Sequence, residues 1–446
     1  MPKSLPQISW RWLLVGALAA MVALAVACGD DDDGGDGSPT DTPSDTGEPT
    51  APSDDALKIG SLLALTGDLA DYGPPINTGM ELAAKEINAN GGVLGQDIEI
   101  VEGDTGTSPD QAAQEAQRLV DIEGVHAIVG ALSSGVSLRV AEQVTGPSGV
   151  LQISPASTSP ALTNANDSDF LFRTTISDAA QGLVLAALAE DAGITSVCNM
   201  FVNNAYGEGL SDSFTAAFGD VGGTITGAVP HEQEQPSYAT ELGECGDATT
   251  LAALAYPESA GIFLREAVED TLFENYLFVD GTKSTSMLDQ LGWANFDGVR
   301  GTAPAALPTD ANTGFEERYT AEYGSLSTQP FIKEGYDAVY LIALAAEAAG
   351  SLDRTAIRDS LRDVSNSPGT AIAPGPEGWA AALTALAAGE DINYDGVAGP
   401  HEFDANGDTL VGAVEWFHVD GAGEAFVQDK VFRADLDAGT VEEITE

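Results

Sequence analysis

The chain has 446 residues, 43% of them hydrophobic, which is long enough for two lobes that each bury a core. Its 17 Lys and Arg residues face 70 Asp and Glu residues, so the net charge is −53. A surface this acidic repels phosphate groups, which excludes nucleic acid and anionic membrane surfaces as partners. Two explanations of the charge stay open, namely adaptation to saline surroundings and a bias for solubility.

The first 27 residues have the pattern of an export signal. Lys3 and Arg11 precede an apolar run over 12–27, which is shorter than the roughly 20 residues that span a bilayer. The run ends in Ala-Val-Ala-Cys, which resembles the lipobox of bacterial lipoproteins and implies that Cys28 is lipidated. A plain signal peptide or a membrane anchor is the alternative. Residues 28–55 are acidic and almost free of apolar side chains, which predicts a disordered tether.

From residue 57 onward, short apolar runs alternate with amphipathic helices. Strands are expected at 58–63, around Ile98 and Ile100, at 126–130 and at 150–153, then again at 196–202, 224–229, 251–255 and 276–279. The first helix is stopped by Asn90-Gly91-Gly92, and Ser108 begins the next with a capping box. The run 301–305 is expected to return to the first lobe, before a helix over 333–349.

This alternation predicts an α/β fold with two doubly wound parallel-sheet lobes. We expect the chain to divide between the lobes as follows: residues 56–176 and 304–412 in lobe 1, residues 177–303 and 413–446 in lobe 2. Several chain crossings then join the lobes as a hinge beside a cleft. In such sheets ligands bind beyond the carboxyl ends of the strands, so the loops that leave strands are the informative ones.

Several of these loops carry groups that suit a small zwitterion. The candidates are Tyr72, Ser134, the loop 154–160, Tyr206, Tyr256 and Asp280. The serine hydroxyl, beside free N–H groups at a helix start, suits a carboxylate. The aromatic rings could clamp an apolar side chain, and the aspartate could pair with an ammonium group. Taken singly, each residue also fits an ordinary helix cap, turn or surface position.

The cysteines fit an exported protein. Apart from Cys28, the chain has Cys198 and Cys245, and a lone pair outside the cytoplasm is expected to be oxidised. A disulfide is therefore predicted, with two separate buried thiols as the alternative. A cysteine nucleophile is not expected, because no His lies in a catalytic context near either residue.

Nearly all of residues 57–430 resembles the type 1 periplasmic binding proteins, and specifically the leucine/isoleucine/valine (branched-chain amino acid) receptors of ABC transporters. The matching stretches are Ile59-Gly60, Leu65-Thr66-Gly67 with Tyr72-Gly73, residues 87–95, Ile128-Val129-Gly130 with Ser133-Ser134, residues 153–158, Phe172-Arg173-Thr174-Thr175, Tyr206-Gly207-Glu208-Gly209 and Gly335-Tyr336-Asp337-Ala338. The resemblance implies a monomeric receptor that closes on a small molecule and delivers it to ABC permease subunits. With the lipobox, it implies a receptor anchored by lipid on the outer face of the cell membrane.

The resemblance also implies roles for individual residues. In amino-acid-binding members, the counterparts of Ser134 and Thr158 hold the ligand α-carboxylate. The backbone at the position of Ala156 and an acid at the position of Asp280 take the α-ammonium, and tyrosines at the three positions named above line the cavity. The best-known receptors have Glu in place of Asp280. The ligand's identity therefore stays open, with amides, urea and aromatic acids as alternatives to an amino acid.

Residues 391–402 fit a calcium-loop template. The ligand positions are Asp391, Asn393, Asp395 and Glu402, with Gly396 at the bend. A Gly-Pro pair interrupts the loop, and residues 403–408 favour a hairpin turn instead of a helix. Calcium and an acidic double turn without metal both stay open, and no other cofactor is expected.

Catalysis is not expected. The chain has no Gly-x-Ser-x-Gly, no His-Glu-x-x-His and no phosphate-binding glycine loop with a following Lys. Its four His residues are scattered along the sequence. The two remaining functions are a transport receptor, which the lipid anchor and tether favour, and the ligand-sensing subunit of a signalling complex.

Overall fold

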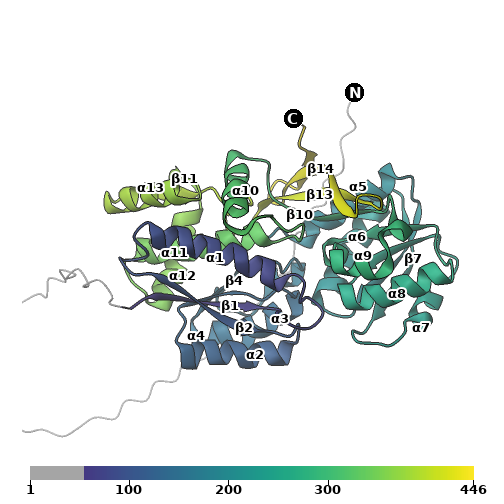
Figure 1. Cartoon of the computed structure of the whole chain (residues 1–446), viewed down its shortest axis with the longest axis horizontal. Helices are drawn as coiled ribbons and strands as arrows, with labels where there is room; N and C mark the ends of the chain where they lie inside the picture. The colour runs from purple at the N-terminus through teal and green to yellow at the C-terminus, as the bar shows by residue number, and fades with distance from the viewer. Residues whose placement is uncertain (1–54, 446) are drawn as a thin grey trace, which may run out of the picture. The chain divides into compact units, whose positions relative to one another are not determined.

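The computed structural model describes residues 55–445, in which strands and helices alternate along most of the chain (Figure 1). The predicted export signal, Cys28 and the tether up to residue 54 lie outside the described residues. Within this part of the chain, no helix has both the length and the apolar character that a membrane crossing requires. Two large sheets organise the fold, and each forms the centre of one lobe.

Lobe 1 is built on a five-stranded parallel sheet with the order β2-β1-β3-β4-β5. Its strands are β1 (Leu57–Leu63), β2 (Ile98–Asp104), β3 (Ala127–Gly130), β4 (Leu151–Ser154) and β5 (Leu171–Arg173). The α-helices between them are α1 (Gly73–Ala89), α2 (Pro109–Arg118), α3 (Ser134–Val140) and α4 (Gly146–Ser148). Helices cover both faces of such a sheet, which explains why β1 and β3 are almost continuously apolar and buried.

The predicted ends of the first helices agree with the structure. The Ser108 side chain accepts a hydrogen bond from the Gln111 N–H, which caps α2. Helix α1 ends at Ala89, and the glycines that follow, Gly91 and Gly92, have φ values of 106° and 68°. Residues with a side chain rarely adopt these angles, so the Gly-Gly pair stops the helix.

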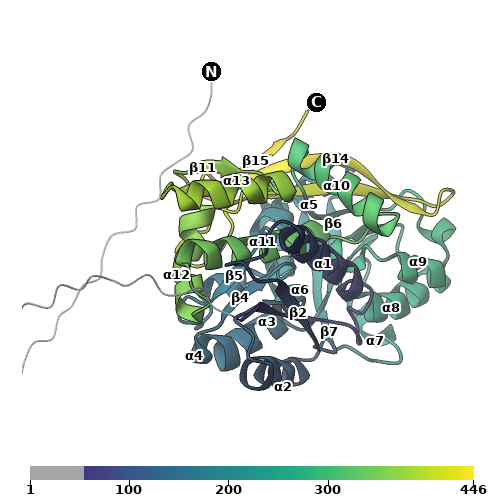
Figure 2. The ribbon, with the colours of Figure 1, turned by 60° about the vertical axis from the view of Figure 1, so that its left-hand side comes forward.

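Helices from the later part of the chain also pack on lobe 1. They are α10 (Asp310–Tyr323), α11 (Ile332–Ala349), α12 (Arg354–Ser365) and α13 (Pro376–Ala387). Figure 2 shows α11 beside α1. Two glycines permit this close approach, because a Cβ at Gly79 would collide with the Ile332 carbonyl and one at Gly335 with the Ile76 side chain. The predicted helix over 333–349 is thus a central element of lobe 1.

Lobe 2 is built on an eight-stranded sheet with the order β15-β14-β13-β10-β9-β8-β6-β7. The parallel strands are β6 (Ser196–Val202), β7 (Thr224–His231), β8 (Thr250–Leu254), β9 (Asn275–Phe278) and β10 (Arg300–Ala305). Three antiparallel strands extend the sheet, namely β13 (Val411–Asp420), β14 (Ala425–Asp435) and β15 (Thr440–Glu443). The α-helices of this lobe are α5 (Asp178–Asp191), α6 (Ala205–Asp220), α7 (Ala239–Glu244), α8 (Pro257–Glu269) and α9 (Thr285–Leu291).

One sequence expectation needs correction: residues 301–305 do not return to lobe 1. They form β10, which pairs with β9 and β13 inside the second sheet. The return follows with α10, whose Arg318 forms an ion pair of 2.7 Å with Glu86 of α1. A short apolar run predicts a buried strand, but its pattern does not say which sheet the strand joins.

Within residues 55–445, the chain crosses between the lobes three times. The crossings are residues 174–177, between β5 and α5, residues 306–309, between β10 and α10, and residues 409–410, just before β13. The Thr174 hydroxyl, at the first crossing, donates a hydrogen bond of 2.9 Å to the Glu334 carbonyl of α11. These segments form the hinge on which the two lobes can move.

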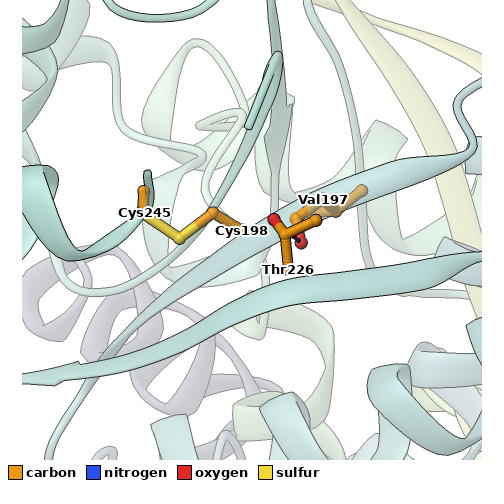
Figure 3. Close-up of a disulfide and its surroundings, with 4 residues drawn as sticks. All are labelled: Val197, Cys198, Thr226 and Cys245. Atoms are coloured by element: carbon orange, nitrogen blue, oxygen red, sulfur yellow. Dashed lines mark hydrogen bonds between the residues drawn. A yellow bond between two sulfur atoms is a disulfide. The ribbon is translucent and has the colours of Figure 1, made fainter. Parts of the chain in front are cut away.

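Cys198 and Cys245 form a disulfide in lobe 2 (Figure 3). Cys198 lies in β6, Cys245 directly follows α7, and their Cα atoms are 5.5 Å apart. Beside the bridge, the Thr226 hydroxyl of β7 donates a hydrogen bond of 3.1 Å to the Val197 carbonyl. The disulfide therefore ties the short helix α7 to the buried strand β6.

The candidate calcium loop begins in a small two-stranded sheet. Residues 392–394 form β12, which pairs in parallel with β11 (Thr370–Ile372), and the Tyr394 hydroxyl donates a hydrogen bond of 2.7 Å to Asp337. The predicted hairpin turn follows, with a bridge between Phe403 and Thr409. Among residues 55–445, no group of three or more His, Cys, Asp or Glu side chains could hold a metal ion. Calcium binding by the predicted loop stays an untested prediction.

Candidate functional site

A cavity between the two lobes collects the loops that leave the strands. It is lined by Leu69, Tyr72, Leu132, Ser134, Ala156, Tyr206, Tyr256, Asp280, Gly281 and Phe331. Lobe 1 supplies residues after β1, β3 and β4, and lobe 2 supplies residues after β6, β8 and β9. The cavity thus lies at the carboxyl ends of both parallel sheets, where α/β folds of this kind place their ligands.

Six of the seven candidate residues line this cavity, and Thr158 is the exception. The Thr158 side chain is fully buried, and its hydroxyl donates a hydrogen bond of 2.9 Å to Asp178 at the start of α5. While that bond exists, the hydroxyl has no proton left for a ligand carboxylate and offers only a lone pair. The contact expected for Thr158 therefore requires the Asp178 bond to rearrange.

Among the described residues that line this cavity, Asp280 is the one acidic residue. Only 4% of its surface is exposed, and its Oδ1 accepts hydrogen bonds from Gln181 at 2.8 Å and from the Tyr206 hydroxyl at 2.9 Å. Burial raises the pKa of Asp280 to about 6, although the two hydrogen bonds oppose the shift. An ammonium group beside this carboxylate would restore the charge balance that burial disturbs.

Asp178 adds a second buried carboxyl group next to this one. Burial and the charge of Asp280 raise the pKa of Asp178 well above its usual value, while the Thr158 bond and the Arg173 charge act in the opposite direction. One oxygen of Asp178 has no hydrogen-bond partner within the described chain. The raised pKa favours a neutral Asp178, so Asp280 is the carboxyl group of this pair that faces the cavity.

Two tyrosine hydroxyls form hydrogen bonds that join the two lobes beside the cavity. The Tyr72 hydroxyl of lobe 1 donates to the Asp280 carbonyl of lobe 2 at 2.9 Å, and the Tyr256 hydroxyl of lobe 2 donates to Ser133 of lobe 1 at 2.9 Å. Tyr206 and Tyr256 stack with ring centroids 5.3 Å apart and an angle of 9° between the rings. Their faces form an aromatic wall on the lobe 2 side.

The carboxylate side of the predicted site is rigidly supported. Ser134 Oγ accepts a hydrogen bond of 3.2 Å from the Ser159 N–H, which leaves the hydroxyl proton free to be donated to a ligand. The buried Arg173 guanidinium donates to the carbonyls of residues 157–159 and forms an ion pair of 2.8 Å with Asp408. These bonds fix the loop that carries the predicted ligand contacts Ala156 and Thr158.

Sequence reasoning missed the apolar part of the lining. Leu69 and Leu132 lie beside predicted contacts on the same loops, and their proximity in sequence was the available signal. Phe331 is far from both leucines in the chain and lies just before α11, with φ at 76°. A bulky residue in the left-handed region is strained, and such strain is frequent in ligand-binding regions. Sequence alone carries no sign of this angle.

The cavity is small in this conformation. Its volume is about 20 Å³, which is close to the space that a single water molecule needs. An amino acid is much larger, so it can enter only if the lobes move apart and the bonds across the cavity change. The hinge is therefore part of the binding site's function.

Acidic groups meet at the mouth of the cleft. Asp68 and Asp71 of lobe 1 accept hydrogen bonds from lobe 2, the first from Gln233 and the second from Ser284 and Ser286. Glu258 of α8 also hydrogen-bonds to Asp68, and this contact raises the pKa of Glu258. Two carboxyl groups can share such a bond only while one holds a proton, so their ionisation opposes the contact.

A protein-family model described as a periplasmic binding protein matches residues 56–424, which is most of the chain. The chain belongs to the periplasmic binding proteins. It is a binding protein and not an enzyme, and its two doubly wound lobes have the type 1 arrangement of that family.

Curated relatives of this periplasmic binding protein cover most of its length. One is the chemotactic signal transduction system substrate-binding protein BasB of Halobacterium salinarum, which is 28% identical over 77% of this chain and 82% of the relative. Another is the Leu/Ile/Val-binding protein homolog 2 of Brucella abortus, which is 27% identical over 69% of this chain and 82% of the relative.

Solved structures share the fold of this periplasmic binding protein. The leucine-binding protein LivK of Thermotoga maritima has a TM-score of 0.70 and 24% identity, and the match covers 86% of this chain and all of that one. A solute-binding protein of an ABC transporter from R. palustris, in complex with benzoate, has a TM-score of 0.68 and 18% identity, over 88% and 98% of the two chains. The same fold thus accompanies different ligands in these neighbours.

Proposed function

We propose that this chain is the extracytoplasmic receptor of an ABC importer and that it captures a small amino acid, with an aliphatic and preferably branched side chain. The receptor would pass this ligand to a membrane permease. A lipid on Cys28 would keep it at the outer face of the membrane. The names of the Leu/Ile/Val-binding homologue and of the leucine-binding LivK support the ligand class.

The observation that carries the proposal is the position of Asp280. A buried carboxylate, with no Lys or Arg in the cavity lining, faces the same small space as the Ser134 hydroxyl and an apolar wall. A ligand with an ammonium group, a carboxylate and an aliphatic chain matches these three features together. An aromatic acid without an amine would leave the Asp280 charge buried and uncompensated.

The mechanism follows from the hinge. With the lobes apart, a ligand can bind first to lobe 1 through Ser134 and the backbone at Ala156. Closure then brings Tyr206, Tyr256 and Asp280 of lobe 2 against the ligand. The closed form is favoured because the ligand interacts with both lobes only in that form. The bond between Tyr72 and the Asp280 carbonyl, or its rearranged equivalent, then helps to hold the lobes together.

Titration calorimetry on the full chain tests the ligand class. The ligands would be leucine, its amine-free analogue 4-methylpentanoate, the uncharged amide acetamide, urea and benzoate. We expect leucine to bind and 4-methylpentanoate to bind at least about tenfold more weakly, because a charge-assisted hydrogen bond contributes about 1.5–3 kcal/mol. Tight binding of benzoate or an amide, with no binding of leucine, would contradict the amino-acid assignment but not the receptor assignment.

A second function deserves a test, because BasB is named as part of a chemotactic signal transduction system. The same capture of an amino acid could report to a signalling partner instead of a permease. Deleting the gene distinguishes the two roles in the native host. Loss of amino-acid uptake at low external concentration supports transport, whereas loss of a behavioural response with normal uptake supports sensing.

A further inference from the structure

Glu334 is a buried carboxyl group at the hinge. It lies in the first turn of α11, and only 5% of its surface is exposed. No Lys, Arg or His within residues 55–445 forms an ion pair with it. Its carbonyl accepts the hydrogen bond from Thr174 at the first crossing, so its backbone is tied directly to the hinge.

Two hollows flank this residue, and the crossings contribute to both. The larger has a volume of about 140 Å³. It is lined by Glu334 and the segment 326–333 before it, by residues 304–306 at the end of β10, and by Lys283, Glu415 and Gln428 of lobe 2. The smaller has about 10 Å³ and is lined by Glu334 with Thr174, Ile176, Val411 and other residues. A rotation of the lobes about the crossings must therefore change the walls on both sides of Glu334.

The charged groups around Glu334 do not neutralise it. Asp337, one helical turn further along α11, raises the pKa of Glu334, whereas Lys333 and His401 lower the pKa of Glu334. Lys333 is engaged with Glu316 at 2.7 Å and His401 with Asp337 at 2.8 Å. Lys283 and Glu415 of lobe 2 also line the larger hollow. They form an ion pair with each other and not with Glu334.

Burial is the dominant influence on this carboxyl group and raises the pKa of Glu334 to about 7. The ionised form is therefore disfavoured in the conformation seen here, in which the lobes touch across the cavity. A conformation that lets water reach Glu334 would ionise it at a lower pH, nearer the usual 4.5 of a glutamate.

We propose that Glu334 is a proton-sensitive element of the hinge, whose neutral form favours contact between the lobes and whose ionised form favours their separation. The effect is absent below about pH 4.5, where the carboxyl is neutral in both conformations. Separation becomes more favourable as the pH rises, and the effect levels off above about 7, where both conformations are ionised. The closed-to-open ratio falls by about tenfold for each unit by which the pKa differs between the conformations.

The test measures the distance between the lobes without any ligand, so it does not depend on the proposed function. Spin labels are attached to the full chain through non-natural amino acids at the exposed positions of Gln114 in α2 and Glu269 in α8, which spares the native cysteines. Pulsed electron paramagnetic resonance then gives the fraction of separated lobes between pH 4.5 and 8. We expect the wild-type chain to show a separated fraction that rises with pH.

The decisive variant is Glu334→Gln, which keeps the shape and stays neutral. We expect a smaller pH response from it, with only the contribution of the other acidic groups between the lobes, such as Asp280 and Glu258. Glu317→Gln, an exposed position in α10, is the matched control and should behave like wild type. Glu334→Met gives a second neutral side chain in case the first variant folds poorly. Identical pH responses in wild type and either folded neutral variant would overturn the proposal.

Discussion

The hydroxyl of Tyr72 in lobe 1 donates a hydrogen bond of 2.9 Å to the backbone carbonyl of Asp280 in lobe 2, 208 residues further along the chain. The same residue whose carboxylate is the candidate ammonium ligand thus also joins the lobes through its backbone. Ligand recognition and lobe closure therefore share one position in the structure.

Asp280→Asn should remove the ammonium contact while keeping the side-chain shape. We expect the affinity for leucine to fall by about 10- to 100-fold, since hydrogen bonds to charged groups contribute about 1.5–3 kcal/mol. Affinity for an amine-free ligand of the same shape, such as 4-methylpentanoate, should fall little or even rise. Titration calorimetry measures both, and equal losses for the two ligands would contradict the assigned role of Asp280.

Ligand affinity should also depend on pH through Asp280. Its pKa is raised to about 6 by burial, and an ammonium ligand needs the ionised form. Affinity for leucine should therefore be at its maximum above about pH 7 and should decline by up to about tenfold per pH unit below about pH 6. Measurements in the Glu334→Gln variant avoid the hinge effect, which has the opposite sign. A leucine affinity that stays constant from pH 7.5 to 5 would count against an ionised Asp280.

The Asp280 carboxylate should also reduce the stability of the ligand-free protein. In the unfolded chain Asp280 titrates near 3.8, and in the fold near 6, so its ionisation lowers the free energy of unfolding progressively as the pH rises between these values. The loss reaches about 3 kcal/mol at most. We therefore expect Asp280→Asn to raise the Tm at pH 7.5 and to change it much less at pH 4. A Tm difference that is independent of pH would contradict this account.

Ionised carboxyl groups at the cleft mouth should make closure sensitive to salt. Asp68 and Glu258 face each other from different lobes, and their repulsion at neutral pH is screened by added salt. Glu258→Gln should therefore increase ligand affinity by a few-fold at low ionic strength and have less effect at high ionic strength. Glu377→Gln, on the exposed side of α13, is the control. An effect of Glu258→Gln that is equal at all salt concentrations would argue against this repulsion.

Removing the disulfide should weaken the fold without changing ligand selectivity. The bridge joins residues 47 positions apart, and a loop of that size typically contributes about 2–4 kcal/mol. The double variant Cys198→Ser and Cys245→Ser should unfold at lower denaturant concentration and should rank ligands in the same order as wild type. A changed ranking would mean that α7 and its neighbours influence the cavity directly.

The alternation of strands and helices could be predicted well, because the apolar periodicity and the helix caps act locally. The runs at 196–202 and 333–349, for example, match β6 and all but the first residue of α11. Sheet membership depends on pairing between distant segments, and that is why the run over 301–305, which lies in β10, was expected in the wrong lobe. The antiparallel extension by β14 and β15 carries no sequence signal that distinguishes it from any other hairpin.

The residues of the candidate site could likewise be predicted only where the local sequence places them. Residues in the loops that leave strands, such as Tyr72 and Asp280, could be located because parallel strands bring their carboxyl ends together. Asp178 and Gln181 act from inside a helix, and Phe331 reaches the cavity through an unusual backbone angle. These contributions depend on three-dimensional packing, so the local sequence pattern did not predict them.

The most direct test of the account is calorimetric titration of the wild-type chain with leucine and with 4-methylpentanoate at pH 7.5. The two ligands have the same aliphatic chain and carboxylate and differ only in the amine. We predict that leucine binds and that loss of the amine weakens binding at least about tenfold, because the buried Asp280 carboxylate then lacks its partner. Equal affinity for the two ligands, or stronger binding of 4-methylpentanoate, would contradict amino-acid capture by this site.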